Sequence, residues 1–204
     1  MSKTLIKICG LRRPEDIAAV NEVQPDYVGF VLFPGSKRYV TPETVKELRT
    51  GLAPGIRVVG VFVDEEPETV ARLLEEGVID IAQLHGHEDA AYLETLRRQT
   101  DKPLIQAFRI RNEADVQRAM ESAAGEILLD AGAGDGKTFD WELLKHTTRP
   151  YFLAGGLNPE NAAGAVKRLR PYAVDVSSGV EKDGFKDPDR IRDFVDKVRM
   201  EDAT

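Results

Sequence analysis

Short runs of apolar and β-branched residues recur along this chain at a nearly constant interval, and each is followed by a stretch with helical periodicity. Successive runs begin 22 to 30 residues apart. They predict strands at Thr4–Ile8, Tyr27–Phe33, Arg57–Val63, Ile79–Gln83, Pro103–Phe108, Glu126–Asp130, Pro150–Ala154 and Ala173–Val176. Such alternation requires parallel strands and right-handed crossovers, and eight units can close without an exposed edge. The sequence therefore predicts an α/β fold, a small (β/α)8 TIM barrel over residues 1–204 as a single domain.

Prolines mark where several of the predicted helices begin. In the first helical turn a proline loses no hydrogen bond and already has the helical φ angle. These prolines are Pro14, Pro42, Pro67, Pro159 and Pro188. Thr41, Asn158 and Asp187 precede three of them and are predicted N-caps. An open doubly wound sheet is the competing fold, but the turn after the first strand, Cys9–Arg13, lacks the glycine pattern of a dinucleotide site.

The charge and apolar content of the chain limit its partners. The formal net charge is −7 and the pI is about 5.1, whereas nucleic-acid or polybasic membrane surfaces need clustered cations. No apolar run approaches the roughly 20 residues that span a bilayer, and we expect no signal peptide before the first strand. We therefore expect a cytoplasmic protein with no nucleic-acid or membrane partner. The single cysteine, Cys9, allows neither an internal disulfide nor a cysteine-rich metal site.

The last two predicted strands end in residues suited to phosphate binding. Gly155 and Gly156 allow close backbone approach, and Asn158-Pro159 is predicted to open a helix whose free N–H groups favour an anion. Ser178 and Gly179 follow the eighth strand and add hydroxyl and amide donors. Barrels of this class often bind phosphate with these two loops, so we expect a phosphate site here. Ordinary turn chemistry is the alternative interpretation.

Cys9 and Asp130 each close an apolar strand at the end where such barrels place their active sites. The two strands are not neighbours, so their ends can face each other across the barrel mouth. A thiolate and a carboxylic acid placed in this way form a general base and general acid pair. Cys9 could instead be an inert small hydrophobe, and Asp130 a turn residue.

The loop after the second predicted strand is the longest excursion at this face, because the excess of residues falls in Pro34–Tyr39. It carries Lys37 and Arg38, which predict either a cation for an anionic substrate or a solvated basic turn. His85 and His87 could bracket a metal ion, but no carboxylate completes a recognisable set. We therefore expect no metal site.

The glycine-rich segment Ala131–Thr138 resembles a nucleotide-binding P-loop only at its end. The motif needs a glycine five residues before the Gly136-Lys137-Thr138 triplet, where this chain has Ala131. We interpret the segment as a flexible loop over the pocket.

Taken together, the motifs resemble those of the phosphoribosylanthranilate isomerase family over essentially the whole chain. Individually weak, they are specific in their order and spacing. They are Lys7-Ile8-Cys9-Gly10, Phe33-Pro34-Gly35-Ser36-Lys37-Arg38-Tyr39, Gln83-Leu84-His85-Gly86, Leu129-Asp130, Gly136-Lys137-Thr138-Phe139-Asp140-Trp141, Leu153-Ala154-Gly155-Gly156-Leu157 and Asp175-Val176-Ser177-Ser178-Gly179-Val180-Glu181.

This resemblance implies an Amadori rearrangement of N-(5-phosphoribosyl)anthranilate, a step of tryptophan biosynthesis that needs neither cofactor nor metal. Cys9 would be the general base and Asp130 the general acid. Arg38 would hold the anthranilate end, and His85 and Asp175 would be further substrate-binding residues.

The expected chemistry requires shifted pKa values for the Cys9 thiol and the Asp130 carboxyl. At neutral pH the pKa of the thiol should lie below about 8.5 and that of the carboxyl above about 3.9. We expect amides and cations to lower the first, and burial to raise the second. The alternatives are another phosphate-binding barrel enzyme acting on a sugar phosphate and a non-catalytic phosphate-ligand binder. The chain is expected to be a monomer or a homodimer.

Overall fold

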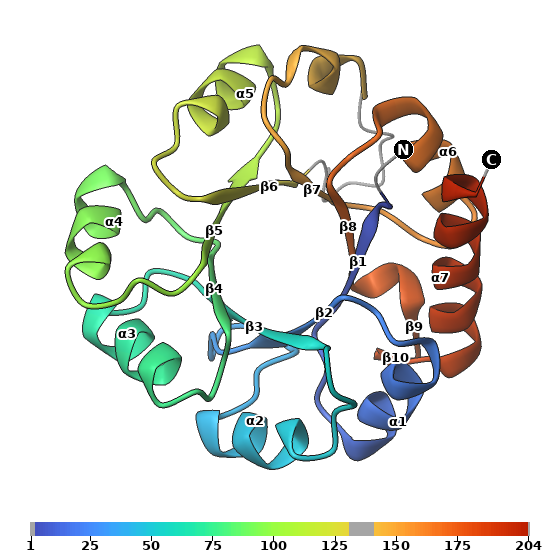
Figure 1. Cartoon of the computed structure of the whole chain (residues 1–204), viewed down its shortest axis with the longest axis horizontal. Coiled ribbons are helices and arrows are strands. Elements are labelled where there is room, and N and C mark those ends of the chain that lie inside the picture. The colour runs from blue at the N-terminus through green and yellow to red at the C-terminus, as the bar shows by residue number, and fades with distance from the viewer. Residues whose placement is uncertain (1–2, 131–140, 204) are drawn as a thin grey trace.

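Eight parallel strands close into a barrel in which each strand pairs with the next and β1 pairs with β8 (Figure 1). The structure, a computed structural model, describes residues 3–130 and 141–203. The strands are β1 Leu5–Cys9, β2 Tyr27–Val31, β3 Arg57–Phe62, β4 Ile81–Leu84, β5 Leu104–Arg109, β6 Glu126–Asp130, β7 Phe152–Ala154 and β8 Ala173–Val176. The predicted (β/α)8 barrel is confirmed.

A ring of helices surrounds the barrel (Figure 1). The helices are α1 Pro14–Val23, α2 Pro42–Arg49, α3 Pro67–Glu75, α4 Ala90–Arg97, α5 Glu113–Met120, α6 Ala162–Leu169 and α7 Pro188–Asp202, with 3-10 turns η1 Trp141–His146 and η2 Ser178–Val180. Four helices begin at the predicted prolines. Thr41 accepts a hydrogen bond from the N–H of Thr44, and Asp187 one from that of Arg190, so both predicted N-caps are confirmed.

The predicted start of α6 at Pro159 is wrong, because the helix begins at Ala162. The side chain of Asn158 accepts from the Asn161 N–H at 3.0 Å, and the side chain of Asn161 accepts from the Asn158 N–H at 2.9 Å. These reciprocal bonds close a separate turn. Pro159 therefore lies in this turn, and Asn158 is not the helix cap.

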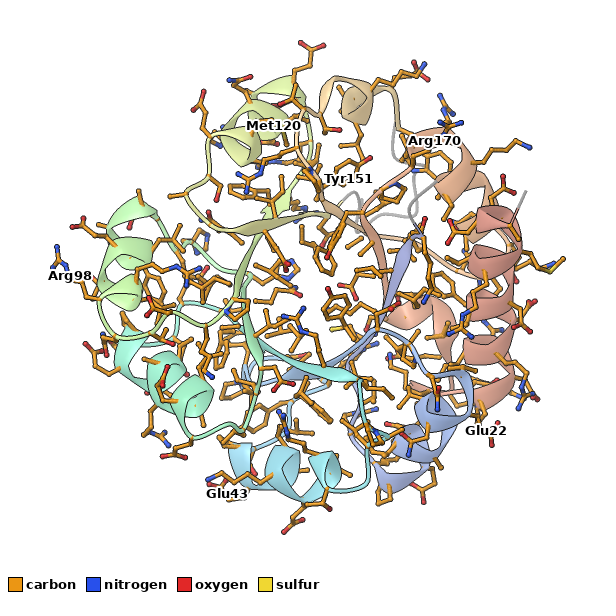
Figure 2. All side chains as sticks on the ribbon, viewed as in Figure 1. Glu22, Glu43, Arg98, Met120, Tyr151 and Arg170 are labelled. Atoms are coloured by element: carbon orange, nitrogen blue, oxygen red, sulfur yellow. The ribbon has the colours of Figure 1, made fainter. Side chains whose placement is uncertain are left out.

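The alternation of side chains along each strand separates two cores. Ile6 and Ile8 of β1 belong to the layer between barrel and helices, whereas Leu5 packs inside the barrel. Lys7 and Cys9 share the parity of Leu5 and therefore face inward. Figure 2 shows side chains filling both layers, while charged ones such as Glu43 and Arg98 project outward from the helices.

Aromatic rings fill the amino-terminal end of the barrel interior. Phe152 packs edge-on against Tyr27 at 5.4 Å and against Tyr172 at 5.6 Å between ring centroids. This packing fills the amino-terminal end of the barrel interior. The polar residues at the carboxyl ends of the strands therefore lie over a packed apolar layer. Among the described residues, no helix is long and apolar enough to cross a membrane.

Candidate active site

Cys9 ends β1 and lies opposite Gly29 of β2 in the strand register. A Cβ atom at Gly29 would come within 2.6 Å of the thiol sulfur, so only glycine leaves room for this side chain. The Cys9 side chain is 7% exposed. Burial raises the pKa of the thiol more than attraction to Lys7 and Lys186 lowers it. The expected lowering of this pKa is therefore wrong, because the cations do not offset the loss of water.

A buried ion pair lies beneath the thiol. The Lys7 ammonium is 2.9 Å from Asp175 Oδ2, and the two residues are register partners on β1 and β8. Burial alone would lower the pKa of Lys7, but Asp175 and Cys9 outweigh it and raise the pKa. The positive charge of Lys7 is therefore favoured close to the sulfur. Sequence reasoning assigned Asp175 to the pocket but missed Lys7, although a lysine at an inward-facing strand position signals a buried partner.

Arg38 follows β2 and is bound by a carboxylate of the chain. Its Nε and Nη2 donate to the two oxygens of Glu181 at 2.6 and 2.8 Å. Lys186 adds a third contact to Glu181 at 2.8 Å. Burial would raise the pKa of Glu181, but the hydrogen bonds from Arg38 and Lys186 outweigh it and lower the pKa to about 2. Glu181 and Lys186 were not identified as site residues from the sequence.

A different set of contacts lies at the ends of β4 and β6. The Nδ1 atom of His85 accepts from the Gln83 amide at 3.0 Å, so neutral His85 carries its proton on Nε2. That nitrogen lies 3.5 Å from Asp130 Oδ2. The Asp130 side chain is 29% exposed, so its expected burial is only partial. The structure thus brings His85 to Asp130, and Gln83 is a residue that sequence reasoning missed.

The two loops expected to bind phosphate lie against each other. Gly155 and Gly156 adopt φ angles of 92° and 68°, a region that favours glycine. A Cβ atom on Gly179 would lie 1.9 Å from the Leu157 carbonyl oxygen, so the loop after β8 packs directly onto the loop after β7. Ser178 begins η2 beside this contact. Because α6 starts after the Asn158–Asn161 turn, its N-terminus is not where the sequence placed it.

The remaining predictions have mixed outcomes. The segment Ala131–Thr138, expected to cover the pocket, lies outside the described residues. His87 hydrogen-bonds Asp64 at 2.9 Å and is almost fully exposed, away from His85. Within residues 3–130 and 141–203, no three histidine, cysteine, aspartate or glutamate side chains are grouped as metal ligands.

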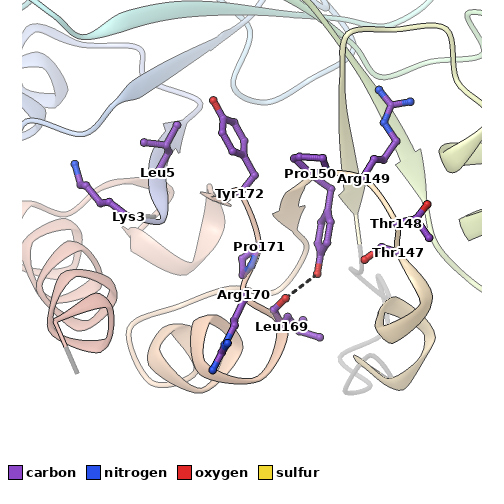
Figure 3. Close-up of a pocket in the computed structure, with 11 residues that line it drawn as sticks. Lys3, Leu5, Thr147, Thr148, Arg149, Pro150, Leu169, Arg170, Pro171 and Tyr172 are labelled. Carbon is purple, nitrogen blue, oxygen red and sulfur yellow. Dashed lines mark hydrogen bonds between the residues drawn. The ribbon is translucent and has the colours of Figure 1, made fainter. Parts of the chain in front are cut away.

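A cavity of about 440 Å³ lies at the opposite end of the barrel (Figure 3). Its walls come from the segments that precede β1, β7 and β8, with Lys3, Arg149 and Arg170 as its cations. Arg149 donates to the carbonyl oxygens of Ser122 and Ala124, and Lys3 pairs with Asp26. These two charges are therefore used within the chain, and the cavity is separate from the strand ends that carry Cys9 and Asp130.

Known proteins of one family are similar to this chain over nearly its whole length. The family model described as N-(5'phosphoribosyl)anthranilate (PRA) isomerase matches residues 6–197. The isomerase of Acetivibrio thermocellus is 45% identical over 98% of both chains, and that of Endomicrobium trichonymphae is 44% identical over 95% of this chain and 98% of its own. The crystal structure of the isomerase from Thermotoga maritima superimposes with a TM-score of 0.89 at 39% identity, covering 97% of this chain and 99% of its own. The chain belongs to the N-(5'-phosphoribosyl)anthranilate isomerase family.

Proposed function

We propose that this chain catalyses the Amadori rearrangement of N-(5-phosphoribosyl)anthranilate to 1-(2-carboxyphenylamino)-1-deoxyribulose 5-phosphate, with Asp130 as the general acid and Cys9 as the general base. One observation carries the assignment of roles. An inward-facing thiol beside a buried lysine ends β1, and a partly exposed carboxyl ends β6, at the same mouth of the barrel. A relative in this family was solved with reduced 1-(o-carboxyphenylamino)-1-deoxyribulose 5-phosphate bound, which supports the substrate class.

The reaction begins with the acid. Asp130 donates its proton to the ribose ring oxygen while the bond from that oxygen to C1′ breaks. The lone pair of the anthranilate nitrogen forms the C=N bond, giving an iminium ion. His85 Nε2 faces the carboxylate that Asp130 becomes and stabilises its charge.

The base completes the rearrangement. The Cys9 thiolate removes the proton from C2′, and the electrons of that C–H bond form the enolamine as the iminium nitrogen is neutralised. Protonation at C1′ and loss of the C2′ hydroxyl proton then give the ketone. The oxidation of C2′ is balanced by the reduction of C1′ within the substrate, so no redox cofactor is required. The ammonium of Lys7 favours the thiolate against the cost of burial.

The ends of the substrate are bound on either side of these groups. Gly155, Gly156, Ser178 and Gly179 supply the phosphate site, which the direct packing of their two loops supports. Arg38 binds the carboxylate of the anthranilate ring.

The assembly and location of the protein are part of the same proposal. We propose a monomer or a homodimer, because a structure of monomers generated from the dimeric Thermotoga maritima isomerase is a close structural match with a TM-score of 0.85. The expected cytoplasmic location stays a prediction.

The test follows the loss of anthranilate fluorescence when the protein meets freshly made phosphoribosylanthranilate. Cys9→Ala and Asp130→Asn should each lose about 10²–10⁴ in rate while staying folded. The exposed Asp101→Asn is a matched control that should keep full activity. An inert wild type would favour another sugar-phosphate enzyme or a binder, and active Cys9→Ala and Asp130→Asn variants would overturn the assigned roles.

A further inference from the structure

One edge of the Arg38 guanidinium is occupied by the protein itself. Glu181 accepts from Nε and Nη2 in a two-bond, fork-like contact, and the side chains are only 18% and 7% exposed. Among the described residues, Arg38 Nη1 donates no hydrogen bond. A guanidinium has five N–H groups in a planar array, so one edge can be held while another faces a ligand.

Glu181 is itself anchored to the loop after β8. Lys186 donates to Glu181 Oε1 at 2.8 Å and to the Ser177 carbonyl oxygen at 2.8 Å. The Lys186 ammonium is almost fully buried, so these contacts replace its lost water. Because Ser177 directly precedes Ser178 and Gly179, Lys186 connects the carboxylate that holds Arg38 to one of the two loops of the phosphate site.

A short hairpin presents Glu181 and Lys186 to Arg38. Strands β9 Glu181–Lys182 and β10 Phe185–Lys186 pair in register, so Glu181 lies opposite Lys186. The turn between them uses two positive φ angles, 52° at Asp183 and 80° at Gly184, as a two-residue hairpin turn requires.

Neighbouring loops hold this hairpin in place. The guanidinium groups of Arg12 and Arg13 lie over the Phe185 ring at 4.9 and 4.2 Å. Arg12 also donates to the carbonyl oxygen of Lys37, which directly precedes Arg38. The hairpin is therefore attached both to the loop after β1 and to the loop that carries the arginine.

We propose that Glu181 is a positioning residue that orients Arg38, so that the free edge of the guanidinium receives the aryl carboxylate of the substrate. This proposal rests on the proposed function. Lys186 fixes the distance between that carboxylate site and the phosphate loop. Selectivity for a substrate with a carboxylate on the ring thus depends on a residue that does not touch it.

A competing role for Glu181 predicts the opposite sign. If Glu181 occupied the place of the substrate carboxylate, the substrate would have to displace it, and removing its charge would tighten binding. If Glu181 orients Arg38, removing its charge weakens binding, because Arg38 then samples other rotamers.

The experiment compares two ligands by titration calorimetry: reduced 1-(o-carboxyphenylamino)-1-deoxyribulose 5-phosphate and its counterpart without the carboxyl group. Glu181→Gln should weaken the first about 10- to 100-fold, the range expected for a hydrogen bond to a charged group. The second should change less than about threefold, because it has no carboxylate for Arg38 to bind. Glu181→Asp keeps the charge but is too short to span both donors, so it should weaken the first ligand in the same way.

Two further variants sharpen the result. Glu76→Gln is the matched control, since Glu76 also contacts two cations, Lys46 and Arg72, but on the exposed surface. It should leave both affinities unchanged. In an Arg38→Met background, Glu181→Gln should cause little additional loss, because the two residues act as one unit.

Each outcome is decisive for Glu181. Tighter binding in Glu181→Gln would show a competitor, equal weakening of both ligands would show a merely structural role, and unchanged affinity would show no role. All three overturn the proposal. A wild-type protein that neither binds the first ligand nor turns over phosphoribosylanthranilate would instead refute the proposed function.

Discussion

The two sides of the barrel mouth are built differently. The thiol sector comprises Lys7, Cys9, Arg38, Asp175, Glu181 and Lys186. Its side chains are mostly buried, and ion pairs of 2.6–2.9 Å join them. The carboxyl sector comprises Gln83, His85 and Asp130. His85 and Asp130 are each about one third exposed, and the distance between His85 Nε2 and Asp130 Oδ2 is 3.5 Å. The proposed base is thus held among buried ion pairs, while the proposed acid is partly exposed.

The difference matches the needs of the two groups. A carboxyl that donates a proton in each turnover must regain one, and exposure of Asp130 and His85 provides access to water. A thiolate that removes a proton from carbon reacts best when its position is fixed and water is excluded. The cost is that burial raises the pKa of Cys9.

The largest expected effect concerns stability. Lys7→Met leaves the Asp175 carboxylate buried without its cation and should cost about 3–5 kcal/mol in the free energy of unfolding. His85→Asn should cost less than about 1 kcal/mol, because its contact is partly solvated. Urea denaturation measures both. Adding Asp175→Asn to Lys7→Met should restore much of the loss. Similar costs for Lys7→Met and His85→Asn would show that the two sectors do not differ in their contribution to stability.

Unfolding at acid pH should reveal the contribution of Glu181 to the stability of the fold. Its pKa of about 2 in the folded protein lies below the value near 4.5 of a free glutamate, so the pairing stabilises the fold above about pH 4.5. The stabilisation is lost as the pH falls from about 4.5 through 2. The unfolding free energy of wild type should therefore exceed that of Glu181→Gln by about 3 kcal/mol near neutral pH, and the gap should shrink over that range. A gap that does not depend on pH would contradict this.

The Cys9 thiol should ionise at a higher pH than an ordinary cysteine. Because burial raises its pKa, Cys9 should ionise above the ordinary value of about 8.5. The ultraviolet absorbance of the thiolate, measured against Cys9→Ala, gives the midpoint directly, since the chain has one cysteine. Lys186→Met should move the midpoint higher, because Lys186 favours the thiolate. A wild-type midpoint below about 8.5 would show that the cations outweigh burial.

The smallest expected effect tests the carboxyl sector. Gln83→Glu places a group that only accepts beside His85 Nδ1, so neutral His85 should shift its proton from Nε2 to Nδ1. Nitrogen-15 NMR distinguishes the two tautomers, with His85→Asn identifying the signal. The rate should fall no more than about tenfold, the value of one hydrogen bond. Gln106→Glu on the neighbouring strand, whose amide contacts the Glu88 carbonyl, should leave the His85 signal unchanged; an unchanged signal in Gln83→Glu would refute the assigned contact.

Local sequence patterns were enough to predict the architecture. Strand periodicity and proline-marked helix starts depend on neighbours within a few residues, and they placed Cys9 and Asp130 correctly at strand ends. The predicted start of α6 at Pro159 was wrong, because Asn158 and Asn161 hydrogen-bond each other and close a separate turn before the helix. The same residue types serve both arrangements, so composition does not separate them.

The sequence by itself determined the eightfold repeat, the strand ends and the residue types available for acid–base chemistry, because these follow from short-range periodicity. The tertiary structure alone decided the partners: Lys7 with Asp175 across 168 residues, and Arg38 with Glu181 across 143. It also decided the direction in which the pKa of Cys9 moves. The physical reason is that burial and charge pairing depend on which residues barrel closure brings together, and no local pattern records those distances.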